Sequence, residues 1–355
     1  MSSKSNKVGN IISVLFLLLF LLKHYSFPTE TLTQFTTSYI TETTTITIKC
    51  VGDTMLGSIT PKCILPKDIS VFNEISHHLK DADLIICNLE GVFIEKSYQP
   101  SKHKIEKKNA YIFGMPSNLV DILKILNINV VCMNNNHIMD YGQEGYNYTK
   151  QLLTNTGIYC ATKEEVAKIE IKNTKIAVVA FSFVESKFSI LRINEAKKIV
   201  SQLKQENNIV VVSFHGGAEG EEALHTKDET EYFLGENRGN VVKFARSMID
   251  SGADLVFGHG PHVLRAAELY KGKLIAYSLG NFLTYGNFNI SGKQKYGGIL
   301  EVYLKNNGEF IKANFIPTIQ KYPGIPVYDE KKSALKLINY LGKNDFPNTY
   351  YKFDE

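Results

Sequence analysis

IVVVSFHGG, at residues 209–217, is the stretch that decides the fold of this chain. Four β-branched residues open it, and His215 followed by two glycines closes it. A short apolar run bounded by turn-forming residues predicts a strand that is buried on both faces, as in α/β proteins. His215 would then lie at the carboxyl end of a strand, which is where such sheets bind their ligands.

Five further runs share this construction and stop at a residue able to bind a metal or a phosphate: TITIKCVGD (45–53), LIICNLEG (84–91), INVVCMNNNH (128–137), DLVFGHGPH (254–262) and KLIAYSLGNF (273–282). The intervals between them contain helical patterns at 118–127 with Ser117 as N-cap, at 144–156 before Gly157, at 194–207 and at 241–252. Alternating stretches at 297–304 and 311–318 predict a hairpin. We therefore predict an α/β sheet covered on both faces, in one large domain over 45–320. An extension with one helix, at 330–342, follows over 321–355.

The ends of the predicted strands carry side chains that bind metals in other proteins. They are Asp53, Asn88, Glu90, Asn136, His137, His215, His259 and His262. Taken singly, each has an ordinary structural explanation, such as a capped turn for Asp53 or a packed ring for His215. Parallel strands would nevertheless bring their carboxyl ends together, so we interpret the set as one site.

This mixture of ligand types indicates which metal the site would hold. Carboxylate, amide and imidazole groups without clustered cysteines favour Mn, Fe or Zn. Two cations bridged by a carboxylate would generate a hydroxide near neutral pH and hold a phosphoryl oxygen, and His137 would protonate the leaving group. Four polar residues would contact the substrate or support the ligands: Asn88, Asp140, Ser278 and Asn281. For Ser278 and Asn281 a structural turn is the alternative.

The N-terminus indicates a membrane attachment. Lys4 and Lys7 precede an apolar run from Ile11 to Leu22, and no small-residue cleavage site follows it. These features favour an uncleaved signal anchor over residues 1–25 rather than a cleaved signal peptide, with the globular part outside the membrane. Residues 26–44 are Thr-rich and aperiodic, which is typical of a tether. We therefore expect a single-pass protein of the cell membrane with an extracellular domain.

Net charge and cysteine positions indicate which partners and disulfide bonds the sequence supports. The formal charge is +4, but three unpaired lysines lie in the first 24 residues, so the remainder carries +1. Overall charge thus gives no argument for a nucleic-acid partner. Three of the five cysteines lie inside predicted buried strands, and two occupy loops where they could pair: Cys50, Cys87 and Cys132 in strands, Cys63 and Cys160 in loops.

The order of the motifs resembles a known family. GDTMLGS (52–58), NLEGVF (88–93), NNNHIMDYGQEG (134–145), SFHGG (213–217), GADLVFGHGPHVL (252–264) and IAYSLGNF (275–282) are similar to the motifs of the CapA family of poly-γ-glutamate capsule biosynthesis proteins. The resemblance covers residues 46–318. That family looks like a branch of the calcineurin-like metallophosphoesterases, which implies a four-layer α/β/β/α sandwich with a dimetal site at the strand ends.

The resemblance also implies a role for each ligand. Asp53 would bind the first metal, Glu90 would bridge both, and Asn136 with His215 would bind the second. His259 and His262 would complete the set, with His137 as the catalytic acid. The chain departs from the phosphoesterase pattern in having Met55 where a His is expected, a His-x-x-His closing pair instead of His-x-His, and Glu as the bridging residue. One ion instead of two, or a different hydrolytic reaction, is compatible with these departures.

Three functions remain open from the sequence. The first is an outward-facing, membrane-tethered member of the polyglutamate machinery that acts on the polymer, its carrier or its export, alongside other membrane proteins of that machinery. The second is a general metal-dependent phosphatase or phosphodiesterase acting on a phosphorylated substrate. The third is a non-catalytic scaffold that binds metal or anionic polymer.

Overall fold

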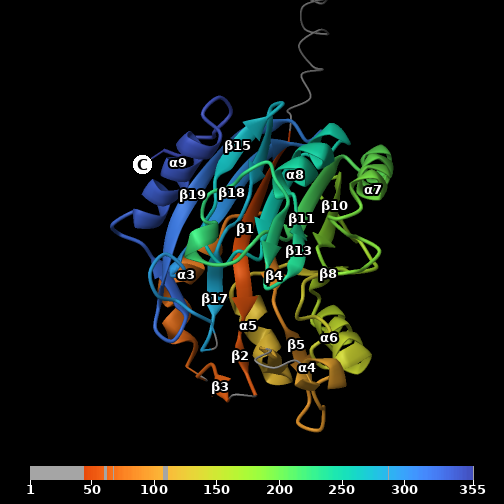
Figure 1. The fold of residues 1–355 in the computed structure, drawn as a ribbon, viewed down its shortest axis with the longest axis vertical. Coiled ribbons are helices and arrows are strands. Elements are labelled where there is room, and N and C mark those ends of the chain that lie inside the picture. The colour runs from red at the N-terminus through yellow and green to blue at the C-terminus, as the bar shows by residue number, and fades with distance from the viewer. Residues whose placement is uncertain (1–43, 60–61, 67, 107–110, 287, 355) are drawn as a thin grey trace, which may run out of the picture. The chain divides into compact units, whose positions relative to one another are not determined.

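The computed structural model describes residues 44–59, 62–66, 68–106, 111–286 and 288–354 (Figure 1). The predicted anchor, and all of the predicted tether except Thr44, lie outside these residues. From Thr44 onward the chain forms one compact unit. None of the helices that the structure describes is long and apolar enough to cross a membrane.

Sheet 1 has eight strands and contains the first three predicted strands. β1 pairs in parallel with β4, and the parallel series continues to β7 and β8. On its other side β1 pairs antiparallel with β18, which belongs to the predicted hairpin, and its end also pairs with β17. The order is β20 (Ile325–Tyr328), β19 (Phe310–Lys321), β18 (Tyr296–Lys305), β1 (Thr45–Met55), β4 (Leu84–Leu89), β7 (Val130–Met133) and β8 (Tyr159–Thr162), with β17 (Asn281–Thr284) beside β1.

Sheet 2 has six strands and contains the other three predicted strands. Its four central strands are parallel, and each edge strand is antiparallel to its neighbour. The order is β15 (Ala267–Tyr270), β16 (Lys273–Ala276), β14 (Leu255–His259), β11 (Ile209–His215), β10 (Thr174–Ser182) and β9 (Ala167–Ile171). The short two-stranded sheets are β2 (Gly57–Ser58) with β3 (Cys63–Ile64), β5 (Val92–Ile94) with β6 (Gly114–Pro116), and β12 (Glu231–Phe233) with β13 (Glu236–Gly239).

The two sheets pack face to face. Because side chains alternate along a strand, Ile48 of β1 points to the core shared with Val211 of sheet 2, whereas Val51 points away from it. The outer face of sheet 1 packs against α5 (Val120–Ile125) and α6 (Gly142–Asn155). The outer face of sheet 2 packs against α7 (Ile193–Glu206) and α8 (Val241–Asp250), which lie side by side in Figure 1. These layers confirm the predicted α/β/β/α sandwich.

The remaining helices are peripheral. α9 (Ser333–Asp345) packs against β15, β18 and β19, and with β20 it places residues 321–354 in the same compact unit. The short helices are α3 (Asn73–Ser76) and α4 (Lys102–Glu106), and the 3-10 turns are η2 (Ile69–Phe72), η3 (His77–Leu79), η4 (Ser117–Leu119) and η5 (Glu221–Ala223).

Some local expectations need correction. The six predicted strands form, but they divide between two sheets, so each sheet has helices on one face and the other sheet on the second. Ser117 does not cap α5. It lies inside the 3-10 turn η4, and Leu119 occupies the cap position without a side-chain hydrogen bond. Cys63 and Cys160 are both free thiols and do not pair.

Candidate metal centre

Close backbone packing places the two acidic residues of the site. A Cβ atom on Gly52 would come within 1.9 Å of the carbonyl oxygen of Gly280, so only glycine fits before Asp53. The amide of Asp53 then donates to that same carbonyl at 2.9 Å. Glu90 follows β4 directly, and its amide donates to the carbonyl of Thr54 at 2.9 Å. Both carboxylates are thereby fixed at the same edge of sheet 1 and are fully buried.

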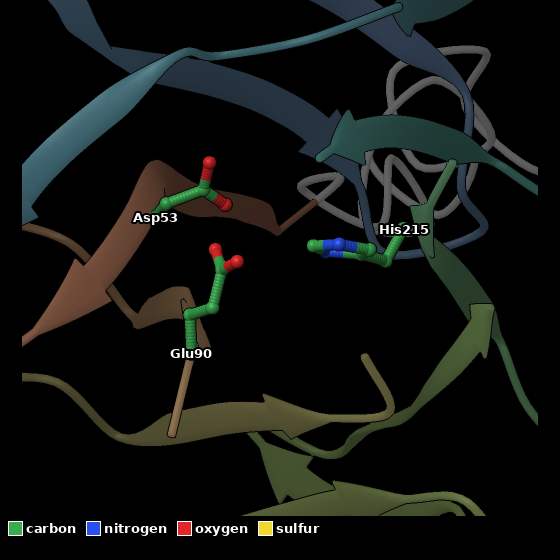
Figure 2. A group of neighbouring side chains, drawn as sticks. All are labelled: Asp53, Glu90 and His215. Carbon is green, nitrogen blue, oxygen red and sulfur yellow. The ribbon is translucent and has the colours of Figure 1, made fainter. Parts of the chain in front are cut away.

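His215 comes to these carboxylates from the opposite sheet. It is the last residue of β11, and its ring is 1% exposed. Asp53, Glu90 and His215 each offer one ligand atom, and these atoms lie within 4.8 Å of one another. Figure 2 shows the three side chains converging on one point. Since Asp53 and Glu90 belong to sheet 1 and His215 to sheet 2, the site lies at the junction of the two sheets.

The His-x-x-His pair converges on the same carboxylates. The Nδ1 atom of His262 lies 2.9 Å from Asp53 Oδ2, and its Nε2 atom lies 3.6 Å from Glu90 Oε1. His259 Nδ1 lies 3.5 Å from Asp53 Oδ1. His262 has φ of +56°, a conformation that non-glycine residues seldom adopt and that occurs most often at functional sites. This backbone conformation accompanies the convergence of two rings that are spaced three residues apart.

Four asparagines lie at or near the carboxylates, and their hydrogen bonds differ. Asn88 Nδ2 donates to Asp53 Oδ1 at 2.8 Å and to Glu90 Oε2 at 3.4 Å. Asn135 fixes that orientation, because its own Nδ2 donates to Asn88 Oδ1 at 3.1 Å. Asn134 instead binds the carbonyls of residues 180 and 188, which belong to sheet 2 and the loop after it. Asn134 Oδ1 and Asn136 Oδ1 are both buried without a hydrogen-bond partner, so each offers a free oxygen, while Asn134 is also held through its amide nitrogen.

His137 is held in a network of its own beside the carboxylates. Its Nδ1 atom lies 2.8 Å from Asp140 Oδ2, and its Nε2 atom lies 3.9 Å from Glu90 Oε1. Burial lowers the pKa of His137, while Asp140 acts in the opposite direction. Lys104 lies 2.7 Å from Asp140 Oδ1, and Phe113 packs against the imidazole with ring centroids 4.2 Å apart and the planes tilted by 33°. Sequence analysis missed Lys104 and Phe113, because no motif marks either.

Ser278 and Asn281 hold loops at the rim of the site. The hydroxyl of Ser278 donates to the carbonyl of Val263 at 2.7 Å, which supports the loop that carries His262. Asn281 Nδ2 donates to the carbonyls of His262 and Gln294 at 3.4 and 3.1 Å. The hydrogen bonds of Ser278 and Asn281 therefore support the loop next to the proposed ligands, which is one of the alternatives the sequence left open.

The residues present fit a divalent metal. Several buried oxygen and nitrogen atoms that could bind a metal have no hydrogen-bond partner in the described part of the site. They include Glu90 Oε1, His215 Nε2, Asn136 Oδ1 and both ring nitrogens of His259. Buried polar atoms are nearly always paired, so this group of unpaired acceptors around two carboxylates is best explained by a cation. Met55, the departure from the phosphoesterase pattern, packs in the core on the outer face of sheet 1, where its sulfur accepts from the amide of Gly57 at 3.1 Å.

The electrostatics of the site favour a cation as well. Burial alone would lower the pKa of His262, but Glu90 and Asp53 raise it to about 10. Burial raises the pKa of Glu90 well above its ordinary value. Burial also lowers the pKa of His215, which favours the neutral ring that a metal requires. The two carboxylates thus create a field that stabilises positive charge where their side chains meet.

Comparison with known proteins identifies the family. A model of the family described as bacterial capsule synthesis protein PGA_cap matches residues 47–285, which include every site residue described above. This chain belongs to that family. The predicted CapA relationship is therefore confirmed.

Two relatives named CapA align with most of this chain. The chain is 28% identical over 278 residues to the PGA biosynthesis protein CapA of Bacillus subtilis (strain 168), covering 73% of this chain and 67% of that protein. It is 25% identical over 291 residues to the capsule biosynthesis protein CapA of Bacillus anthracis, covering 75% of this chain and 66% of that protein. The chain thus spans about two thirds of the length of these relatives.

One solved structure with a related arrangement is the NAD nucleotidase of Haemophilus influenzae. Its TM-score is 0.42 at 12% identity, covering 83% of this chain and 62% of that chain. At this level of similarity the fold assignment rests on the strand order and the layers themselves.

Proposed function

We propose that this protein is a membrane-anchored, outward-facing hydrolase of the poly-γ-glutamate capsule machinery that uses a divalent metal. The observation that carries the proposal is the buried cluster of Asp53, Glu90 and His215, whose ligand atoms lie within 4.8 Å of one another in a chain of the capsule synthesis family. The names of the Bacillus relatives support the polymer, and the apolar N-terminal segment supports the anchor.

The proposed metal ligands come from both sheets. Asp53, Glu90 and His215 would hold the metal, with His259, His262 and Asn136 completing one or two coordination shells. Such an ion, when bound, would lower the pKa of a water molecule and draw negative charge from a substrate oxygen. Mn, Fe and Zn all suit this set of carboxylate, amide and imidazole ligands.

His137 would act as the general acid. Asp140 Oδ2 lies 2.8 Å from its Nδ1, which orients the ring and leaves Nε2 toward the carboxylates. Phe113 packs against the ring and contributes to its burial. A proton on Nε2 can then pass to the leaving group of a substrate bound at the carboxylate cluster, whether a phosphate ester of the carrier or a bond in the anionic polymer.

The test uses full-length protein purified in detergent. Elemental analysis should find Mn, Fe or Zn, and a screen against a generic phosphodiester and a γ-linked glutamate oligomer should find metal-dependent hydrolysis of one of them. Turnover of the phosphodiester alone would favour the general phosphatase. Protein without bound metal, and without thermal stabilisation on adding metal, would contradict the proposed centre.

A non-catalytic scaffold is the second candidate, and one observation favours it. Met55 stands where a further metal ligand would be expected, and its side chain packs away from the site in the core. A centre with fewer ligands could bind metal and anionic polymer without hydrolysing anything. Metal binding without turnover of either substrate would select this function.

A further inference from the structure

His215 and His262 are each followed by a loop, and both loops lead to the same ion pair between Arg265 and Glu231. Ala218 follows His215 by three residues, and Arg265 follows His262 by three residues. The guanidinium of Arg265 donates to the carbonyl of Ala218 at 3.1 Å. It also donates through both terminal nitrogens to Glu231, at 2.8 and 2.7 Å.

Glu231 binds Ala218 as well. It is the first residue of β12, and its Oε2 atom accepts from the amide of Ala218 at 2.8 Å. Both the amide and the carbonyl of Ala218 are therefore bound by this pair. The ion pair links three segments: the loop after His215, the hairpin β12–β13, and the loop after His262.

The packing around the guanidinium is tight. Arg265 is 0% exposed, and burying a charge so completely is expensive unless its geometry is nearly ideal. Gly217 has φ of +87°, and a Cβ atom there would lie 2.9 Å from Arg265 Nη1. Glycine at this position thus lets the arginine contact the backbone directly after the ligand loop. This accounts for the second glycine of the SFHGG motif, which the metal site itself does not use.

We infer that Arg265 and Glu231 are positioning residues that set the distance between His215 and His262, and through it the affinity of the metal centre. The inference rests on the proposed metal site. Neither residue has a described hydrogen bond to Asp53, Glu90 or the histidines, so any effect on metal binding must act through the two loops. Partners behind metal ligands commonly change metal affinity by about 10- to 100-fold when removed.

The chain contains a matched control. Arg246 and Glu268 form a second pair with two parallel hydrogen bonds, at 2.9 and 2.8 Å, and Glu268 is fully buried. This pair joins α8 to β15 and has no described hydrogen bond to either ligand loop. Glu268 also accepts hydrogen bonds from the hydroxyls of Tyr277 and Thr349, and glutamine at this position keeps an acceptor for them. Replacing Arg246 and Glu268 should therefore lower stability without removing a hydrogen bond of either ligand loop.

The experiment compares two double variants of the full-length protein, R265M/E231Q and R246M/E268Q. Glutamine keeps an acceptor for the Ala218 amide, and removing both charges avoids leaving one buried charge unpaired. After treatment with a chelator, Mn²⁺ binding is measured by titration calorimetry well below the melting temperature. We expect R265M/E231Q to bind Mn²⁺ at least tenfold more weakly than the wild type, and R246M/E268Q to bind it as the wild type does.

The outcomes separate the inference from the proposed function. Unchanged affinity in R265M/E231Q, or an equal loss in both double variants, would overturn the positioning role alone. A wild-type protein that binds none of Mn²⁺, Fe²⁺ and Zn²⁺ would overturn the metal centre together with its support. If R265M/E231Q fails to fold, the single variant R265K, which keeps the charge but loses the two parallel hydrogen bonds, must show the tenfold loss or the inference fails.

Discussion

Replacing Asn88 by Asp tests whether the hydrogen bonds from the Asn88 amide stabilise the two carboxylates of the site. In the structure Asn88 Nδ2 donates to Asp53 Oδ1 at 2.8 Å and to Glu90 Oε2 at 3.4 Å. The variant has nearly the same shape, but it would place a third carboxylate where an N–H donor now lies. Without metal, three buried carboxylates would face one another. With metal, the new oxygen would be one more ligand.

The expected magnitude follows from the distances. The 2.8 Å bond to Asp53 is a hydrogen bond to a charged group, and such bonds contribute about 1.5–3 kcal/mol. The longer bond to Glu90 adds less, while repulsion between buried carboxylates adds to the loss. We expect the free energy of unfolding of the metal-free variant to fall by about 3 kcal/mol, which lowers the melting temperature by about 6–12 °C. Saturating Mn²⁺ should recover most of this loss, because a ligand that binds only the folded state stabilises it.

The assay is thermal melting of the wild type and N88D, each with chelator and with Mn²⁺. Asn134→Asp serves as the control, because Asn134 Nδ2 donates to the carbonyls of Ala180 and Phe188 instead of to Asn88 or the site carboxylates. It should be destabilised with and without metal alike. The reasoning is refuted if N88D melts like the wild type in chelator, or if Mn²⁺ stabilises N88D no more than it stabilises the wild type.

Three further predictions concern the site, the fold and the topology. His215→Ala should lose metal and activity together, whereas His137→Ala should keep its metal and lose about 10²–10⁴-fold in rate, as metal analysis and kinetics on the same samples would reveal; loss of metal in both would mean that the roles are wrongly assigned. Gly52→Ala should destabilise the fold by more than about 3 kcal/mol in denaturant melts, because its Cβ would lie 1.9 Å from a carbonyl oxygen that also binds the Asp53 amide; a near-wild-type melt would disprove the close contact. Protease added to cells stripped of their wall should digest the globular part, since Lys4 and Lys7 precede the apolar segment, and full protection would reverse the topology.

The strands were predictable because their signal is local. A run such as residues 209–215 is apolar throughout, and burial on both faces is the simplest state for it. Which sheet each strand joins depends on pairings between distant residues, such as Asp53 of β1 with Asn281 of β17. Periodicity carries no information on such pairings. The sequence therefore predicted six strands, and the resemblance to a family was needed to predict two sheets.

The site was predictable only where a strand end marked it. His215 and His259 end their strands, so their place follows from the strand itself. Lys104 reaches His137 by way of Asp140, from a short helix more than thirty residues earlier in the chain. Neither α4 nor Phe113 belongs to a motif, and their contacts arise only when the fold is complete.

The position of the site between the sheets links metal binding to the packing of the whole domain. Asp53 and Glu90 are held by the backbone of sheet 1, while His215 and His259 end adjacent strands of sheet 2 that pair directly with each other. The inner faces of the two sheets are otherwise joined by apolar contacts, which have no preferred direction. Hydrogen bonds across this junction fix its register: Asn134 binds backbone carbonyls of sheet 2 and its loop, and His262 binds Asp53. A cation shared by Asp53, Glu90 and His215 would add a third connection at the same place. A metal bound there would therefore depend on both sheets keeping one alignment, while the Arg265–Glu231 pair would hold the two ligand loops on the side of sheet 2.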